Sequence, residues 1–359
     1  MAPGLLESGI DLRVAVLHDR GGLTSELQSC GVEVRVVGGS TRSAWLQNAV
    51  RLVGIVRPDL VHTTLFESDL AGRLGAYVRR VPVVSTLAST PYGPEHSSEH
   101  GIRRTRMRAA QALDALTGKL VTRFHAVSRS AADAGISRLH IDPAKIEVIP
   151  RGRDLRRLGE RSAERRTTVR QRLGVDEDAP MLLVLSRQEP QKGIDVLLRA
   201  MPRILREEPR ARLIVAGREG RATAGYATWL SDGAVERATS FLGERDDVAD
   251  LLAAADILVL PSLREGLPGA VLEAMAVGIP IVGSDLPPVR EAVPGPEYAL
   301  LVPPGRPELL GDAVIEVLRN PAQAIERASN ARFRFEECFD IAQVVAAMAR
   351  FYRTALRTS

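Results

Sequence analysis

The chain reads Arg264-Glu-Gly-Leu-Pro-Gly-Ala-Val-Leu-Glu-Ala-Met-Ala-Val-Gly-Ile-Pro-Ile281 near its C-terminal end. Two carboxylates, Glu265 and Glu273, stand on either side of a Gly-Leu-Pro-Gly turn at 266–269, which we expect to open a short helix. An apolar run at 257–260 leads into the turn and predicts a strand. A strand followed by a helix start places the positive end of a helix at the carboxyl edge of a sheet, where α/β folds bind phosphate groups.

The two acids have a use that phosphate binding alone does not explain. If the helix begins near Gly269, Glu273 lies roughly 6 Å along its axis, whereas Glu265 lies in the preceding loop. Carboxylates in these places can accept hydrogen bonds from hydroxyl groups on either side of a bound phosphate. A sugar nucleotide carries hydroxyls on both sides of a diphosphate, so the segment indicates a ligand of that class.

Apolar runs alternate with helical patterns along the rest of the chain. In the second half they predict buried strands of a parallel sheet at Met181–Leu185, Leu213–Ala216, Thr239–Leu242, Ile257–Leu260, Ile279–Gly283 and Ala299–Val302. The first half repeats the pattern at Leu12–Leu17, Val32–Val37, Leu60–Thr63, Pro82–Thr86, Phe124–Val127 and Ile146–Ile149. The predicted fold class is therefore α/β, with two Rossmann-like doubly wound domains that face one another across a cleft.

We predict a first domain at 1–165, a second domain at 166–335 and a C-terminal helix at 336–359. The amphipathic pattern of this last helix needs an apolar surface, which either the first domain or the second domain can supply. Residues 1–9 read like the end of a helix followed by a glycine. We therefore expect the first domain to lack its first strand and the glycine-rich loop after it.

Composition excludes several classes of protein. A length of 359 residues with 45% hydrophobic residues suits two globular domains, and the net charge is only +4. Lys occurs only at 119, 145 and 192, so 45 of the 48 basic residues are Arg; compositional bias explains this, and we predict no nucleic-acid partner. No run approaches the roughly 18 to 20 apolar residues of a membrane span. The histidines lack ligand spacing and the two cysteines lie far apart, so we expect no metal site and a cytoplasmic protein.

Two cations follow the strand predicted at 181–185. Arg187 and Lys192 lie in the loop Ser-Arg-Gln-Glu-Pro-Gln-Lys-Gly before the next helix, where a planar guanidinium and a compact ammonium suit a diphosphate. A solvated basic loop is the simpler reading of either residue alone. A lysine retained in a chain that otherwise uses Arg favours the functional reading.

These features belong to a set of motifs spread over nearly the whole chain. The set comprises Leu260-Pro-Ser-Leu-Arg-Glu-Gly-Leu-Pro268, the spacing of Glu265 and Glu273, Ala274-Met-Ala-x-Gly278-x-Pro280, the loop from Arg187 to Gly193, Val215-Ala-Gly217, Phe241-Leu-Gly243, Pro58-Asp59 and Ile149-Pro-x-Gly152-x-Asp154. In this combination the chain resembles the retaining family-four glycosyltransferases of the GT-B fold, which are of the group 1 type.

The resemblance implies roles for the residues of the motifs. Arg187 and Lys192 would hold the diphosphate of a nucleoside diphosphate sugar, and Glu265 would act beside the reacting carbon; these three form the predicted catalytic set. Glu273 would bond the ribose hydroxyls. The other predicted donor-binding residues are Gly266, Leu267, Pro268, Gly269, Gly217 and Leu242. The resemblance also implies that no metal or other cofactor takes part.

The first half departs from the family pattern at positions that concern the acceptor. Many relatives carry His where this chain has Ala88, so we predict that Thr86 and Ser89 line the acceptor side instead. The Arg-rich segment from Arg151 to Arg172 carries no predicted strand and reads as the linker between the domains followed by a helix. In the motif that leads into this linker, Ile149-Pro-x-Gly152-x-Asp154, the family's usual Asn is Arg151 here, which either faces an anionic acceptor or has a hinge or surface role. The histidines at 96 and 100 read as surface residues.

The prediction is an enzyme that transfers a sugar from a nucleoside diphosphate sugar to an acceptor hydroxyl with retention of configuration. The acceptor would be a sugar, a lipid-linked molecule or a small molecule, in cell-envelope polysaccharide or glycolipid synthesis. A degenerate, non-catalytic sugar-nucleotide-binding protein and a sugar-nucleotide epimerase of the same fold stay open as alternatives. An NAD-dependent enzyme is disfavoured because no Gly-x-Gly-x-x-Gly follows a predicted strand.

A basic stretch in the first half predicts a membrane contact. Arg103, Arg104, Arg106 and Arg108 precede an amphipathic run at 109–116, a pattern that suits peripheral binding to anionic lipid at the inner face of a membrane. A solvated arginine face is the alternative.

Overall fold

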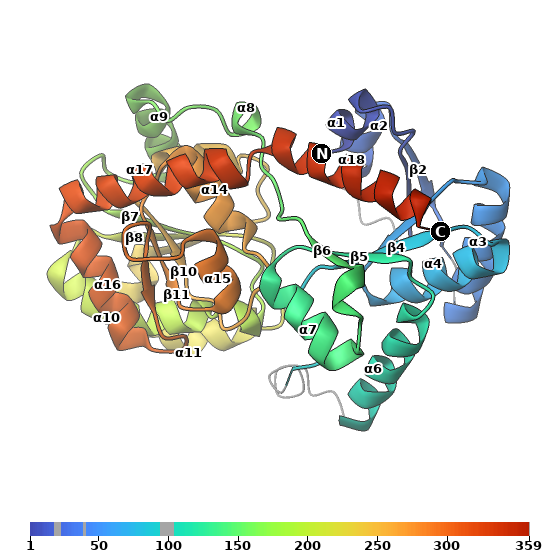
Figure 1. Cartoon of the computed structure of the whole chain (residues 1–359). Coiled ribbons are helices and arrows are strands. Elements are labelled where there is room, and N and C mark those ends of the chain that lie inside the picture. Colours follow the sequence, from blue (N-terminus) through green and yellow to red (C-terminus); the bar gives the residue numbers. More distant parts are fainter. Residues whose placement is uncertain (18–22, 39–40, 94–103, 359) are drawn as a thin grey trace. The chain divides into compact units, whose positions relative to one another are not determined.

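A computed structural model describes residues 1–17, 23–38, 41–93 and 104–358 (Figure 1). Two compact units make up the chain, one formed by Met1–Gly152 with Ile341–Ser359 and the other by Arg153–Asp340. Every segment predicted as a strand overlaps a strand of the structure. Both units are parallel α/β sheets with flanking helices, so the predicted Rossmann-like architecture of each half is confirmed.

The borders between the units differ from the predicted ones. The chain passes from the first unit to the second at 152/153, not at 165/166, and returns to the first unit at 340/341, not at 335/336. The segment from Arg153 to residue 165 therefore belongs to the second unit. The sequence shows a linker there, but only the contacts of its side chains decide which sheet it joins.

The first unit contains strands that fall into two sheets. Its elements are α1 (Ala2–Glu7), β1 (Arg13–Val16), α2 (Leu23–Ser29), β2 (Glu33–Val36), α3 (Arg42–Val56), β3 (Val61–Thr64), α4 (Phe66–Arg79), β4 (Val83–Leu87), α6 (Arg104–Gly118), β5 (Arg123–Ala126), α7 (Arg129–Leu139), the 3-10 turn η1 (Pro143–Lys145), β6 (Ile146–Val148) and α18 (Ile341–Arg357). One sheet has the order β3-β4-β5-β6, and β1 and β2 pair separately. Among the described residues no pairing joins β1 to β3. The expectation that this domain lacks a strand stays a prediction.

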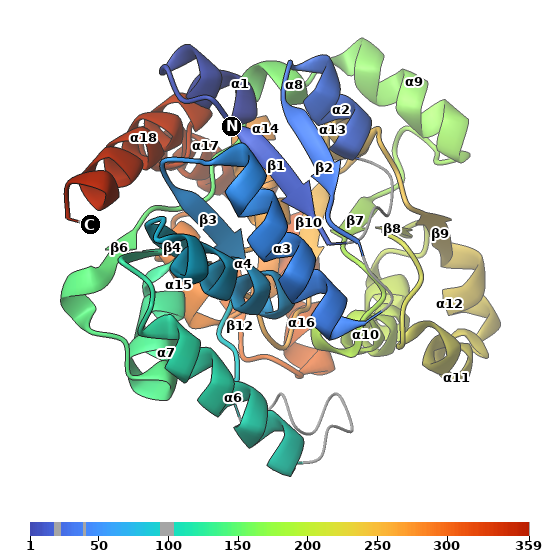
Figure 2. The ribbon, with the colours of Figure 1, turned by 90° about the vertical axis from the view of Figure 1, so that its right-hand side faces the viewer.

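Helix α18 is part of the first unit's core. Its buried side chains, including Phe351, form one cluster with Leu5 of α1, Val84 of β4 and Ile149 beyond β6. Helix α4 packs on β3 and β4, and α3 packs on α4, as Figure 2 shows. The apolar face that the sequence predicted for the last helix is thus buried against the first unit.

The second unit contains a single parallel sheet. Its elements are α8 (Leu155–Leu158), α9 (Ala163–Leu173), β7 (Met181–Leu185), η2 (Pro190–Lys192), α10 (Ile194–Glu207), β8 (Arg212–Ala216), η3 (Thr223–Tyr226), α11 (Ala227–Leu230), α12 (Gly233–Ala238), β9 (Thr239–Gly243), α13 (Val248–Ala254), β10 (Ile257–Leu260), α14 (Gly269–Val277), β11 (Ile281–Ser284), α15 (Pro287–Ala292), β12 (Leu300–Val302), α16 (Pro307–Arg319) and α17 (Pro321–Cys338). The strand order is β12-β11-β10-β7-β8-β9.

This order reverses direction between β7 and β10. Successive strands run outward from β7 through β8 to β9, and the chain then returns to place β10 on the other side of β7. The four residues of β10 are all buried, as expected for a central strand covered on both faces. In such a sheet the loops after the two strands at the reversal diverge and leave room for a ligand.

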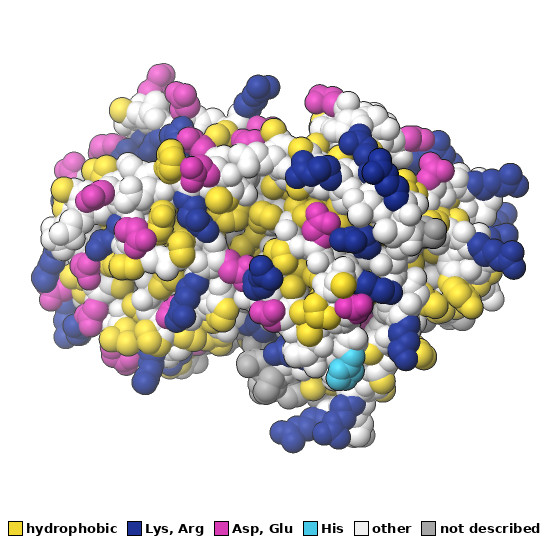
Figure 3. Space-filling model, viewed as in Figure 1, with side chains coloured by type: hydrophobic (Ala, Val, Ile, Leu, Met, Phe, Trp, Pro, Cys, Tyr) yellow, Lys and Arg dark blue, Asp and Glu magenta, His cyan; other side chains and the backbone are white. Residues whose placement is uncertain are grey.

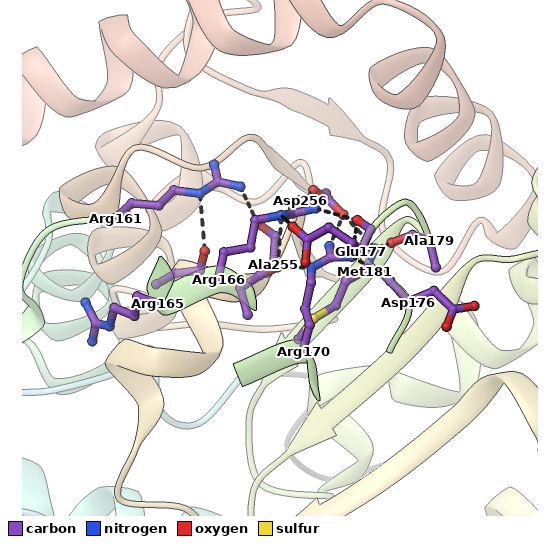
Figure 4. Close-up of polar contacts among 12 residues, drawn as sticks. Arg161, Arg165, Arg166, Arg170, Asp176, Glu177, Ala179, Met181, Ala255 and Asp256 are labelled. Carbon is purple, nitrogen blue, oxygen red and sulfur yellow. Dashed lines mark hydrogen bonds and ion pairs between the residues drawn. The ribbon is translucent and has the colours of Figure 1, made fainter. Parts of the chain in front are cut away.

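Four arginines attach α9 to this sheet at its amino edge. Arg170 is 1% exposed and donates to Asp256 Oδ2 at 2.6 Å, while Arg166 reaches Asp256 Oδ1 at 2.8 Å (Figure 4). Arg161 donates to the carbonyl oxygens of Ala253 and Ala255 at 3.2 and 3.0 Å. Further contacts pair Arg165 with Asp250 and join Arg166 to Ala254 and Arg170 to Ala254, Asp176, Glu177 and Ala179. Cations at the carboxyl end of α13 complement its dipole, which explains why this Arg-rich segment belongs to the second unit.

We expect Arg170→Ala to destabilise the second unit by at least about 3 kcal/mol, because it removes one partner of a buried ion pair and leaves buried carbonyls without a donor. Calorimetric unfolding measures the change. Arg210→Ala is the matched control, because the Arg210 side chain is 63% exposed and its ion pair with Asp178 is long, at 3.8 Å. This control should change stability by less than about 0.5 kcal/mol. Equal effects of the two variants would contradict a structural role for Arg170.

Candidate functional site

The loops that follow β7 and β10 meet at the carboxyl edge of the second unit's sheet. The backbone N–H of Leu263 donates to the carbonyl of Gln191 at 2.8 Å, which joins the two loops. Beside this bond, Lys192 Nζ lies 2.6 Å from Glu265 Oε1, and Ser262 Oγ donates to the same carboxylate oxygen at 2.7 Å. Two residues predicted for the site from different motifs are therefore in direct contact.

Gly193 makes this close approach possible. Its φ is +61°, and a Cβ at this position would lie 2.1 Å from the carbonyl oxygen of Pro261. Any larger residue would push the loop after β7 away from the loop after β10. The glycine next to Lys192 thus fixes the distance between Lys192 and Glu265.

Helix α14 begins at Gly269 and ends at Val277, so the predicted helix start is confirmed. Glu273 lies one turn along this helix, and its Oε1 accepts a hydrogen bond from Arg153 Nε at 2.7 Å. The linker motif left position 153 unspecified, and sequence reasoning missed this arginine. No sequence signal marks a pair whose members are 120 residues apart.

The loop after β8 lies against the end of β7. Gly217 has a φ of +152°, and a Cβ there would lie 1.9 Å from the carbonyl oxygen of Ser186. Its N–H donates to the carbonyl of Gly243 at the end of β9, at 2.7 Å. The ends of three neighbouring strands are therefore tied together at the carboxyl edge of the sheet, and Leu242 lies half-buried on the last of them.

The remaining predicted donor residues occupy two kinds of environment. Leu267 and Pro268 are buried, whereas Gly266 and Gly269 are half-buried at the start of α14. Arg187 is exposed, and its side chain makes no hydrogen bond or ion pair within the described part of the chain. A planar cation with this freedom, a helix N-terminus and the Lys192 ammonium at one sheet edge can together attract a multiply charged anion.

The three predicted acceptor residues have different surroundings. Ser89 and Arg151 are exposed. Thr86, on β4, lies between two histidines: its hydroxyl is 2.6 Å from His62 Nε2 and 3.0 Å from His125 Nδ1. The histidines at 96 and 100 and the arginine at 103 lie outside the described residues.

The two histidines extend Thr86 into a chain of hydrogen bonds. His125 Nε2 lies 2.8 Å from the carbonyl oxygen of Ile149, and Tyr352 Oη of α18 lies 2.7 Å from His62 Nδ1. A carbonyl only accepts, so neutral His125 must donate from Nε2 and accept at Nδ1 from Thr86. Thr86 then accepts from His62 Nε2, and His62 accepts from Tyr352. One pair of neutral tautomers satisfies every bond.

Burial favours this neutral state. Desolvation lowers the pKa of buried His125. Desolvation also lowers the pKa of His62, with a second contribution from His125, but His62 is an exposed residue and solvent weakens both effects. Sequence reasoning treated the histidines as scattered, and the parallel register of β3, β4 and β5 brings these two together.

Within the described ranges, no group of at least 3 His, Cys, Asp or Glu side chains is placed to hold a metal ion. In the same ranges no helix has both the length and the apolar character of a membrane span.

Two family models match the chain. The model described as "Glycosyltransferase Family 4" matches residues 1–157, and the model described as "Glycosyl transferases group 1" matches residues 179–320. These ranges contain the first unit's sheets and the whole of the second unit's sheet, including both loops of the site.

Individual proteins are similar over most of the chain. A glycogen synthase of Mycobacterium tuberculosis is 33% identical over 308 residues, which are 84% of this chain and 70% of that protein. The Escherichia coli UDP-Gal:alpha-D-GlcNAc-diphosphoundecaprenol alpha-1,3-galactosyltransferase is 28% identical over 231 residues, 64% of this chain and 58% of the relative. Among solved structures, Anabaena HepE in complex with UDP-glucose has a TM-score of 0.87 at 22% identity and covers 98% of this chain and 94% of its own. The likeness to HepE shows the two-domain fold.

The histidine chain predicts a loss of stability in acid. Because the pKa values of His62 and His125 are lowered on folding, the unfolded chain binds more protons than the folded chain as pH falls below about 6.5. The stabilisation is therefore present above that pH and is lost as pH falls, by up to about 1.4 kcal/mol per pH unit for buried His125 and by less for His62, whose exposure to solvent weakens the effect. Thermal unfolding between pH 5 and 8 should show a shallower slope for His125→Asn, whereas His140→Asn, at an exposed histidine, should keep the wild-type slope. Identical slopes in all three proteins would rule the linkage out.

Proposed function

The chain belongs to the group 1 glycosyltransferases of family 4, and from this premise we propose that it transfers a sugar from a nucleoside diphosphate sugar to an acceptor hydroxyl with retention of configuration. The observation that carries the proposal is the contact of Lys192 with Glu265 beside the N-terminus of α14. A cation, a carboxylate and a helix start at one sheet edge suit a ligand that combines phosphate with hydroxyl groups.

Each group of the donor site has a distinct task in this proposal. Lys192 and Arg187 bind the diphosphate, and the free amides at the start of α14 add to the positive field. Glu265 accepts hydrogen bonds from the sugar, and Glu273 accepts them from the ribose. Gly217 and Leu242 lie at the ends of β8 and β9, where the base would contact the protein.

The proposed reaction needs stabilisation of charge more than a protein nucleophile. The acceptor oxygen bonds to the anomeric carbon while the bond from that carbon to the phosphate oxygen breaks, and the acceptor proton passes to the departing diphosphate. Attack from the face that the diphosphate leaves gives retention. Lys192 and Arg187 stabilise the charge that develops on the diphosphate, and the site holds the two reactants in place.

The relatives support the choice of donor and suggest a class of acceptor. The Escherichia coli relative is named for UDP-Gal and for an acceptor linked to diphosphoundecaprenol, and HepE was crystallised with UDP-glucose. The chain spans 58% of the length of the Escherichia coli relative. We propose that the acceptor is a sugar or a lipid-linked molecule. We also propose that the protein acts in the cytoplasm at the inner face of a membrane and takes part in cell-envelope polysaccharide or glycolipid synthesis.

We expect Lys192→Ala and Glu273→Ala each to weaken binding of the donor by at least about tenfold, because each change removes one charge-assisted hydrogen bond. Lys192→Ala also leaves Glu265 without its cation next to the diphosphate. Calorimetric titration with UDP-, GDP- and ADP-sugars measures the affinities. Arg206→Ala, an exposed change on α10 of the same unit, is the control and should bind like wild type.

These titrations, together with analysis of the reaction products, decide between transfer and the alternatives. Unchanged donor affinity in both site variants contradicts the donor site. Donor binding with no transfer to any acceptor favours a non-catalytic sugar-nucleotide-binding protein, and conversion of the donor sugar to its epimer without an acceptor favours an epimerase. Retention is read from the anomeric configuration of the product by NMR.

We further propose that α6 contacts an anionic membrane surface. Arg104, Arg106 and Arg108 are exposed in its first turns, and Leu113 and Leu116 are 43% and 62% exposed farther along the same helix. Figure 3 shows a group of Lys and Arg side chains at the lower end of the first unit, where Figure 1 places the start of α6. Basic side chains next to apolar ones suit a surface of anionic headgroups over acyl chains.

The membrane proposal predicts co-sedimentation with vesicles that contain about one-third phosphatidylglycerol, and little with pure phosphatidylcholine. Replacing the three arginines of α6 by Gln should lower bound protein severalfold, since each basic residue near an anionic surface contributes about 1 kcal/mol. Gln at the exposed arginines 51, 57 and 80 is the matched control for the change in net charge. Binding that does not depend on anionic lipid would leave α6 as a solvated helix.

A further inference from the structure

Arg153 contacts the donor site although no motif assigns it there. Its Nε donates to Glu273 Oε1 at 2.7 Å, and the two side chains keep only 27% and 20% of their surfaces exposed. An ion pair that is fully exposed to water contributes little to stability. The pair of Arg153 and Glu273 is largely shielded from solvent, and this shielding strengthens its charge-assisted hydrogen bond. The pair therefore defines the position of the Glu273 carboxylate.

The backbone of Arg153 is held independently of this contact. Its N–H donates to the carbonyl of Phe339 at 3.0 Å, and it forms a parallel bridge with Asp340. The next residue, Asp154, caps α8 by accepting from the N–H of Arg156 at 2.9 Å. Because the chain on both sides is fixed, the guanidinium reaches α14 from a set direction.

The far end of the guanidinium lies over the first residue of α14. A Cβ added to Gly269 would lie 2.1 Å from Arg153 Nη2, so the guanidinium occupies the space that a side chain would fill. Glycine at the helix start thus admits the arginine, and the arginine reaches Glu273 one turn farther along. The position of the Glu273 carboxylate therefore depends on Arg153 and on the absence of a side chain at Gly269.

We propose that Arg153 is a positioning residue for the donor: it holds the Glu273 carboxylate in the orientation that receives the ribose hydroxyls. This inference rests on the proposed function, in which Glu273 bonds the ribose. A carboxylate accepts at two oxygens and about four lone pairs, so Oε1 can keep its bond to Arg153 while the hydroxyls bind. Without Arg153 the carboxylate would rotate freely and stand uncompensated beside a diphosphate.

The test compares ligands that differ only in the ribose. UDP, GDP and ADP and their 2′,3′-dideoxy counterparts are titrated by calorimetry into the wild-type protein, Arg153→Ala, Arg153→Lys and Arg156→Ala. For the diphosphate that binds, we expect wild type to prefer the ribose form by about tenfold or more, since two hydroxyls bond a carboxylate. Arg153→Ala should lose most of this preference, while its affinity for the dideoxy form stays within about threefold of wild type.

The other variants separate positioning from folding. Arg153→Lys keeps a donor for Glu273 and should restore part of the preference for ribose. Arg156→Ala, an exposed change on neighbouring α8, should keep all of it. A variant that is only less stable loses affinity for both ligand forms alike, so the ratio of the two affinities is insensitive to stability.

The outcomes distinguish this inference from the function on which it rests. A wild-type protein that binds none of the three diphosphates overturns the proposed function and the inference with it. A wild type that prefers ribose, with Arg153→Ala retaining the same preference, overturns the inference alone. Equal weakening of both ligand forms by Arg153→Ala also overturns it, because that result assigns Arg153 to the phosphates or to the fold.

Discussion

The proposed donor site depends on the close approach of two loops at the point where the strand order of the second unit reverses. Gly193 passes so near the carbonyl of Pro261 that no side chain fits between them, and this contact sets Lys192 against Glu265. The reversal of strand order supplies the space between the two loops, and Gly193 fixes the width of that space. In a sheet with the same strands in simple sequential order, β8 and β9 would separate β7 from β10, and the two charges would lie on loops that are not neighbours.

Both carboxylates of this site are paired with cations of the protein itself. Lys192 pairs with Glu265, and Arg153 pairs with Glu273, so both carboxylates lie partly buried with compensation. Burying an uncompensated carboxylate would be costly, and each cation removes that cost. The same pairs hold the acids in defined orientations, which suits a reaction whose barrier is lowered by placement and by fixed charge. The helix start at Gly269 then remains as a positive region, with exposed Arg187 at the same sheet edge.

The first unit is organised by a different interaction. A chain of hydrogen bonds runs from Tyr352 of α18 through His62, Thr86 and His125 to the backbone of Ile149. It joins the last helix to three adjacent strands, and apolar packing around Phe351 surrounds it. The hydroxyl of Thr86, which the sequence placed on the acceptor side, is therefore engaged within the fold. An acceptor that bonds this residue has to compete with two imidazoles.

The sequence alone determined the strands, the class of fold and the segment on which the proposed donor site rests. Alternating apolar runs and turn residues are local signals, and so they located every strand and the start of α14 at Gly269. The family motifs are local signals too, and they singled out Lys192 and Glu265. Only the tertiary structure decided which charges meet: the pair of Arg153 and Glu273, the two histidines around Thr86, and the attachment of the Arg-rich linker to the second sheet. These contacts join residues tens to hundreds of positions apart, and strand order and register, which no local pattern records, bring them together.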